Sequence, residues 1–152
     1  KMKIFRQELD ALQGNFKKII EFSQLKLDNL KSNKKNIEIL LNFSKTQSSI
    51  DIKGEINSSI SDICDRCINT FDSKQISKFR VILTQRENLI NDTDSEFILF
   101  DDNKNEIDLS NVVRDTLLLE KPLKTICNKN CKGLCSNCGS NLNFEDCKCL
   151  EN

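Results

Sequence analysis

Hydrophobic and polar residues alternate along three stretches of the chain, a pattern that is typical of β-strands with one buried face. These stretches are residues 37–43, residues 50–60 and residues 78–83, and the short apolar sequence EFILF at 96–100 predicts a fourth strand. The polar residues SKTQSS between the first two strands suit a hairpin loop. Strands joined by short loops predict an antiparallel sheet, either open or rolled into a partly closed barrel.

A helical pattern follows the strands, in the sequence DLSNVVRDTLLLEKP. Asp108 or Ser110 can cap the start of this helix, which we place near residues 109–119, and Pro122 lies just beyond its end. Its apolar face is formed by Leu109, Val112, Val113 and Leu117. The predicted fold class is therefore α+β and rich in β-structure, with one main helix.

The first 35 residues allow two interpretations. The apolar residues recur at spacings of three and four, which favours one helix: Phe5, Leu9, Leu12, Phe16 and Ile19. Gly14 interrupts this stripe, so a short helix followed by a strand through KKIIEF fits equally well.

Hydrophobic residues become sparse after Pro122, and residues 123–152, the tail, are too polar to form a core of their own. Something other than burial must therefore order the tail. We predict a β-rich core at residues 1–122 and a cysteine-rich, zinc-organised tail that packs on it, within a single domain overall.

The cysteines are the strongest chemical signal. Six of the eight lie between residues 127 and 149, and the other two, Cys64 and Cys67, form the sequence CDRC. No apolar signal segment begins the chain, so the thiols are expected to stay reduced. Four close pairs of thiols in a reducing compartment favour metal over disulfides, and we predict two Zn²⁺ ions.

Spacing favours one partnering of these thiols. Four cysteines lie within fifteen residues and can close around one ion, as the second cysteine set: Cys135, Cys138, Cys147 and Cys149. The others form the first cysteine set: Cys64, Cys67, Cys127 and Cys131. Two alternatives stay open: a zinc ribbon that joins Cys64 and Cys67 to Cys135 and Cys138, and a redox-active CxxC at Cys64 and Cys67.

Complete sets of four thiolates leave no open position for a reacting water, and the chain has no histidine to act as a base. We therefore predict that the protein is not an enzyme and has no small-molecule substrate. No stretch of the sequence is apolar enough to approach a membrane span, so no membrane partner is expected either. Positive and negative residues balance at 23 each, so a strongly basic surface overall is not indicated. Locally, however, residues 121–135 carry four lysines and no acid, which suits phosphate contact. The candidate RNA-binding residues are Arg66, Lys121, Lys124, Lys129, Lys132 and Lys148.

The motifs CDRC, IDLSNVVRDTLLLEKPLKTIC, CKGLCSNCGSNLN and CKC together resemble the YceD family, over about residues 37 to 149. Ser136 stands where that family commonly has proline, which changes no metal ligand. The resemblance implies a β-rich fold with a helix and a role in large-subunit (23S) ribosomal RNA accumulation, without known catalysis. Family members that lack the distal tail keep the CxRC pair and ligands near Cys127 and Cys131, which supports the favoured partnering.

The resemblance also implies the partners and the compartment. The expected partners are ribosomal RNA or a pre-50S particle, or a ribosomal or assembly protein, in the cytoplasm or the plastid stroma. Two other functions stay open: a zinc-stabilised adaptor for protein–protein interaction, and a thiol redox sensor.

Overall fold

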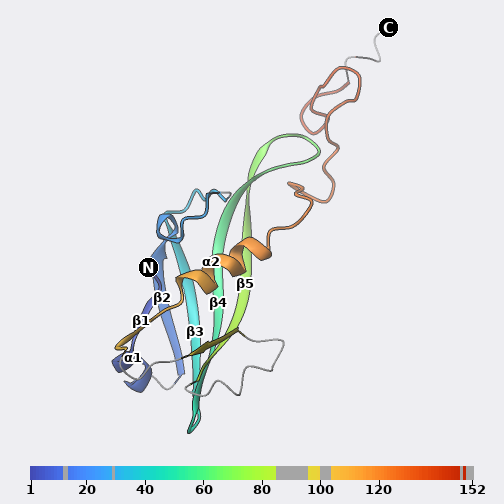
Figure 1. The fold of residues 1–152 in the computed structure, drawn as a ribbon. Coiled ribbons are helices and arrows are strands. Elements are labelled where there is room, and N and C mark those ends of the chain that lie inside the picture. Colours follow the sequence, from blue (N-terminus) through green and yellow to red (C-terminus); the bar gives the residue numbers. More distant parts are fainter. Residues whose placement is uncertain (12–13, 29, 85–95, 100–103, 148, 150–152) are drawn as a thin grey trace.

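A five-stranded sheet forms the body of the protein in a computed structural model, and it curls into a half-barrel (Figure 1). Its strands, in spatial order, are β2 (Gly14–Glu21), β3 (Asn36–Lys45), β4 (Ser49–Ile63), β5 (Thr70–Thr84) and β6 (Glu96–Leu99). The structure describes residues 1–11, 14–28, 30–84, 96–99, 104–147 and 149. The β-rich fold class predicted from the sequence is confirmed.

The alternating pattern that predicted β3 and β4 corresponds to their two faces. In β4, Ile52, Ile56 and Ile60 are buried, and they pack with buried residues of β3 such as Ile39 in one core. The strands of the sheet pair antiparallel except at its edge, where β6 runs parallel to β5. The prediction of an antiparallel sheet therefore holds for all strand pairs but this last one.

β5 is much longer than the predicted stretch at residues 78–83, because it begins at Thr70. Its first half pairs with the second half of β4 and forms a long hairpin that extends beyond the other strands (Figure 1). Ser73 and Gln75 share a face with the fully buried Ser77. Because these positions are polar, the first half of β5 lacks the hydrophobic alternation that would have predicted the whole strand.

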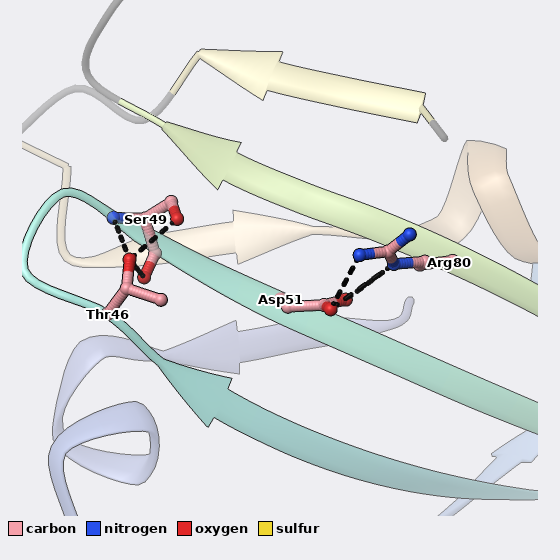
Figure 2. A network of polar contacts seen from close by, with 4 residues as sticks. All are labelled: Thr46, Ser49, Asp51 and Arg80. Atoms are coloured by element: carbon pink, nitrogen blue, oxygen red, sulfur yellow. Dashed lines mark hydrogen bonds and ion pairs between the residues drawn. The ribbon is translucent and has the colours of Figure 1, made fainter. Parts of the chain in front are cut away.

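Polar contacts fix the other end of β4, where it leaves the turn from β3 (Figure 2). The backbone N–H of Thr46 donates to the Ser49 carbonyl at 2.8 Å, and the Ser49 N–H donates to Thr46 Oγ1 at 3.1 Å. Farther along β4, the Arg80 guanidinium of β5 donates to both carboxylate oxygens of Asp51, with Nη2 at 3.0 Å from Oδ2. This paired contact across the strands supports the register of β4 against β5.

The N-terminal region follows the second of the two predicted alternatives, a short helix and then a strand. α1 (Arg6–Ala11) precedes β2, and β1 (Lys3–Phe5) pairs with β7 (Glu106–Asp108) in a separate two-stranded sheet. Strands of three residues are too short to show a period of two, so the sequence did not predict them. A short 3₁₀ helix, η1 (Phe22–Leu25), follows β2.

The main helix, α2 (Ser110–Leu119), lies within a residue of its predicted position. Its predicted apolar face is buried in the core, at Leu109, Val112, Val113 and Leu117. Asp108 Oδ1 accepts the Ser110 N–H at 2.9 Å, and Ser110 Oγ accepts the Met2 N–H at 2.7 Å. The start of the helix is thereby tied to Met2, the residue before β1. No helix among the described residues has the length and apolar content needed to cross a lipid bilayer.

Candidate metal centres

The tip of the β4–β5 hairpin holds the CDRC sequence in a tight turn. The Cys64 N–H donates to the Asn69 carbonyl at 2.9 Å, and the Ile68 N–H donates to the Cys64 carbonyl at 2.9 Å. The turn places Ile68 at a positive φ of 59°. Cys64 and Cys67 are both buried there, although they lie at the end of an extended hairpin.

The tail reaches this tip after α2 and continues beyond it (Figure 1). Asp65 and Thr125 form a reciprocal pair of hydrogen bonds, from the Asp65 N–H to the Thr125 carbonyl at 2.8 Å and from the Thr125 N–H to Asp65 Oδ2 at 2.6 Å. Phe71 and Ile126 pack around the cysteines in a small apolar cluster that is separate from the main core. These contacts bring Cys127 and Cys131 to the hairpin.

The first cysteine set has the dimensions of a tetrathiolate metal site. Its four sulfurs lie within 4.8 Å of one another. Cys64 Sγ lies 3.8 Å from Cys131 Sγ, and Cys67 Sγ lies 3.8 Å from Cys127 Sγ. A tetrahedron of sulfurs about 2.3 Å from a zinc ion has edges of about 3.8 Å, so these residues fit zinc.

The second cysteine set is built locally within the tail. The Cys135 N–H donates to the Ser140 carbonyl at 2.8 Å, and the Gly139 N–H donates to the Cys135 carbonyl at 3.0 Å, with Gly139 at a φ of 74°. Cys147 Sγ lies 3.2 Å from Cys135 Sγ and 3.9 Å from Cys138 Sγ. All four sulfurs again lie within 4.8 Å of one another. This set can also hold a metal ion.

The structure thus groups the eight cysteines in the two sets that spacing favoured, and the zinc-ribbon alternative is not the arrangement found. None of the eight forms a disulfide. Each set supplies four soft sulfur donors, the ligands that structural zinc sites use. That these thiols are metal ligands in the protein stays a prediction.

Hydrogen bonds lower, and burial or neighbouring thiols raise, the pKa values of different thiols within each set. Burial raises the pKa of Cys64, but hydrogen bonds from backbone N–H groups, including that of Cys127, outweigh this effect and lower the pKa to about 6. Burial and the neighbouring thiols raise the pKa of Cys127 to about 12. In the second set the Ser140 hydroxyl lowers the pKa of Cys138 to about 6, and the hydrogen bond with Cys138 raises the pKa of Cys149 to about 12. One thiolate therefore forms easily in each set, while four together require a cation.

Five of the six candidate RNA-binding residues are exposed, and Lys148 lies outside the described residues. Arg66 is held in place, because its Nη1 donates to the Cys131 carbonyl at 3.1 Å. The four exposed lysines lie along the tail and just before it, at Lys121, Lys124, Lys129 and Lys132. None of these four forms an ion pair with another described residue.

Two asparagines near the thiols were not singled out from the sequence. Asn143 Nδ2 lies 3.5 Å from Cys131 Sγ, and Asn141 Nδ2 donates to the Cys67 carbonyl at 3.4 Å. Asparagine is common in turns because its side chain bonds nearby backbone groups. The two asparagines belong to the motif CKGLCSNCGSNLN, but their residue type alone indicated no role beside the thiols.

Comparison with known proteins identifies relatives of the chain. The family model described as "Large ribosomal RNA subunit accumulation protein YceD" matches residues 52–152, a match that begins later than the resemblance from residue 37. A Zea mays protein, "Large ribosomal RNA subunit accumulation protein YCED homolog 1, chloroplastic", is 53% identical over 45 residues. Its Arabidopsis thaliana counterpart of the same name is 48% identical over 44 residues. Each match covers 29% of this chain and only 15% or 14% of the relative. No solved structure matches the chain.

Proposed function

The chain belongs to the YceD family, and from this premise we propose that it is a non-enzymatic zinc protein that supports the accumulation and processing of large-subunit (23S) ribosomal RNA. The observation that carries the proposal is the pair of four-cysteine sets. Both sets lie within residues 52–152, the part of the chain that matches a family described by large ribosomal RNA subunit accumulation. Ribosomal RNA or a pre-50S particle is the proposed partner. Both relatives are chloroplastic by name, which supports the plastid stroma over the cytoplasm as the compartment.

Zinc gives the tail a fixed shape in this proposal. The first set would anchor the start of the tail to the β4–β5 hairpin, and the second would close the loop from Cys135 to Cys149. Sites with four protein ligands are typically structural, since no position stays open for water. The residues of the tail that surround the thiols are mostly exposed, so metal ligation supplies order that burial does not.

RNA contact is assigned to the exposed lysines. Lys121, Lys124, Lys129 and Lys132 lie within twelve residues of one another and have no acidic residue between them. Because they form no ion pair with described residues, their ammonium groups are available to phosphate oxygens. Arg66 brings a fifth positive charge beside Cys131.

The test measures binding of the zinc-loaded chain to large-subunit ribosomal RNA fragments across a salt series. One variant replaces Lys121, Lys124, Lys129 and Lys132 by alanine. A matched control replaces four exposed lysines at or beside the sheet: Lys34, Lys53, Lys74 and Lys78. Each phosphate contact on single-stranded RNA contributes about 0.7 to the salt slope, so loss of four contacts lowers the slope by about 3. Equal affinity and equal slope for the tail variant and the wild type would show that the lysines do not contact RNA.

A protein-interaction adaptor is the second candidate, because apolar side chains are exposed near the thiols. Leu123 is fully exposed, and Ile68 and Phe144 are 66% and 77% exposed. Such residues can anchor a protein partner. Affinity capture repeated after nuclease treatment separates the two functions: a ribosomal protein that stays bound favours the adaptor. The third alternative, a thiol redox sensor, predicts reversible oxidation of Cys64 and Cys67 with loss of metal.

A further inference from the structure

Asn143 connects the two cysteine sets. It lies between Cys138 and Cys147 in the chain and so belongs to the loop that the second set closes. Its side chain, however, points to the first set, where Nδ2 lies 3.5 Å from Cys131 Sγ and Oδ1 accepts the Lys132 N–H at 2.8 Å. One side chain thus contacts both a predicted ligand of the first set and the backbone beside it.

Asn141 orients Asn143. Asn141 Oδ1 accepts both the N–H and the side-chain Nδ2 of Asn143, at 3.1 Å and 2.8 Å. Asn141 Nδ2 reaches the hairpin tip, where it donates to the Cys67 carbonyl and to Asn69 Oδ1, each at 3.4 Å. The loop of the second set is therefore attached to the turn that carries the first set.

Backbone contacts extend the same connection through Gly133. The Leu142 N–H donates to the Gly133 carbonyl at 3.0 Å, and the Leu134 N–H donates to the Arg66 carbonyl at 3.0 Å. A Cβ on Gly133 would lie 3.1 Å from that same carbonyl oxygen of Arg66. The chain around Gly133 is packed between the CDRC turn and the loop of the second set.

We propose that Asn143, oriented by Asn141, is a positioning residue that couples the two centres, so that metal at the second cysteine set raises the metal affinity of the first. This inference rests on the proposed function, in which both sets bind zinc. The loop from Cys138 to Cys147 is polar, and a metal ion would hold it in the one conformation that directs Asn143 Nδ2 at Cys131. An N–H group donated to a thiolate stabilises its negative charge, as outer-shell partners do at other metal sites. The coupling must be reciprocal, so metal at the first set raises affinity at the second.

The test uses Co²⁺, whose thiolate charge-transfer absorption reports tetrahedral sulfur ligation, in competition with a chelator. Affinity at the first set is measured in the wild type, in the double variant Cys138→Ser/Cys149→Ser, in Asn143→Ala, and in the combination. We expect the double variant and Asn143→Ala each to weaken the first set by about tenfold or more. We also expect the combined variant to lose no more than the larger single loss, because both changes remove the same interaction.

Asn128 provides the matched control. Its Nδ2 lies 3.7 Å from Cys127 Sγ, but its loop does not depend on the second set. Asn128→Ala should lower the metal affinity of the first set. When it is combined with Cys138→Ser/Cys149→Ser, the fold-losses in affinity from the two changes should multiply. A second variant, Asn143→Asp, keeps the acceptor for the Lys132 N–H but replaces the donor to sulfur by a negatively charged oxygen. It should therefore weaken the first set at least as much as Asn143→Ala does.

The possible outcomes distinguish a failure of the coupling from a failure of the proposed metal centres on which it rests. Coupling is overturned if the wild type binds two Co²⁺ ions but the first set has the same affinity with the second set disabled. It is equally overturned if the losses from Asn143→Ala and Cys138→Ser/Cys149→Ser multiply as they do for Asn128→Ala. A wild-type chain that binds no Co²⁺ refutes the metal centres themselves and the coupling with them.

Discussion

The two CxxC turns place the residue after their second cysteine in the same unusual conformation, but with different side chains. Gly139 has a φ of 74° and Ile68 has a φ of 59°. A β-branched residue at positive φ is strained, by about 1–2 kcal/mol, because Cβ crowds the carbonyl oxygen. We therefore predict that Ile68→Gly does not destabilise the protein, although it removes a large apolar side chain.

Ile63 provides a reference for measuring the backbone strain at Ile68, since it is a nearby isoleucine in a relaxed conformation. Ile63 ends β4 and is 61% exposed, against 66% for Ile68, so the two side chains lose similar burial when removed. A glycine at either position costs about 0.5–1 kcal/mol through the entropy of the unfolded chain. Ile68→Gly relieves the strain of about 1–2 kcal/mol and should raise the free energy of unfolding by between zero and about 1.5 kcal/mol. Ile63→Gly relieves no strain and also loses about 1 kcal/mol of strand preference. The two variants should therefore differ by about 2–3 kcal/mol in the free energy of unfolding.

The assay is urea unfolding of the metal-loaded chain, with the midpoint and the slope m fitted for the wild type and both variants. If backbone strain at Ile68 is relieved by glycine, the Ile68→Gly midpoint lies at or above the wild-type value and the Ile63→Gly midpoint lies below it, with equal slopes. If Ile68→Gly loses as much stability as Ile63→Gly, then contacts of the Ile68 side chain outweigh the backbone strain, and the reasoning is refuted.

Two further predictions concern the turns and the thiols. Gly133→Ala should lose about 1–2 kcal/mol of unfolding free energy, because φ is 78° and the new Cβ would crowd the Arg66 carbonyl; Gly139→Ala, with open space around its Cβ, should lose less in the same unfolding assay. Metal affinity, measured by chelator competition, should fall as the pH falls, because metal must displace protons from thiols such as Cys127 and Cys149, whose pKa values are raised to about 12. The decline should steepen below about pH 6, where Cys64 and Cys138 also become protonated, and an affinity independent of pH would contradict thiolate ligation.

The sequence predicted those features whose physical cause is local. Isoleucines at every second or fourth position of β4 indicated a strand, and the spacing of Cys135, Cys138, Cys147 and Cys149 indicated that they could close around one ion. The first half of β5 was not predicted, because Ser73, Gln75 and Ser77 replace the apolar residues expected on its buried side. The parallel direction of β6 was not predicted either, since a hydrophobic pattern carries no information on strand direction.

The connection between the cysteine sets could not be predicted for a different reason. Asn141 and Asn143 contact Cys67 and Cys131 only because the folded tail turns back onto the hairpin tip. No periodicity or spacing encodes such a contact, and asparagine in a polar loop is expected without any special role.

Amide hydrogen exchange on the reduced protein, with and without bound zinc, tests the central claim most directly. In the tail, the N–H groups of Cys131, Leu134 and Cys135 donate to backbone carbonyls at 3.1, 3.0 and 2.8 Å. If metal ligation orders the tail, a chelator should abolish protection of these three amides and leave that of the middle of β4 unchanged. Equal protection of the three amides in the zinc-bound and the metal-free protein would contradict the account.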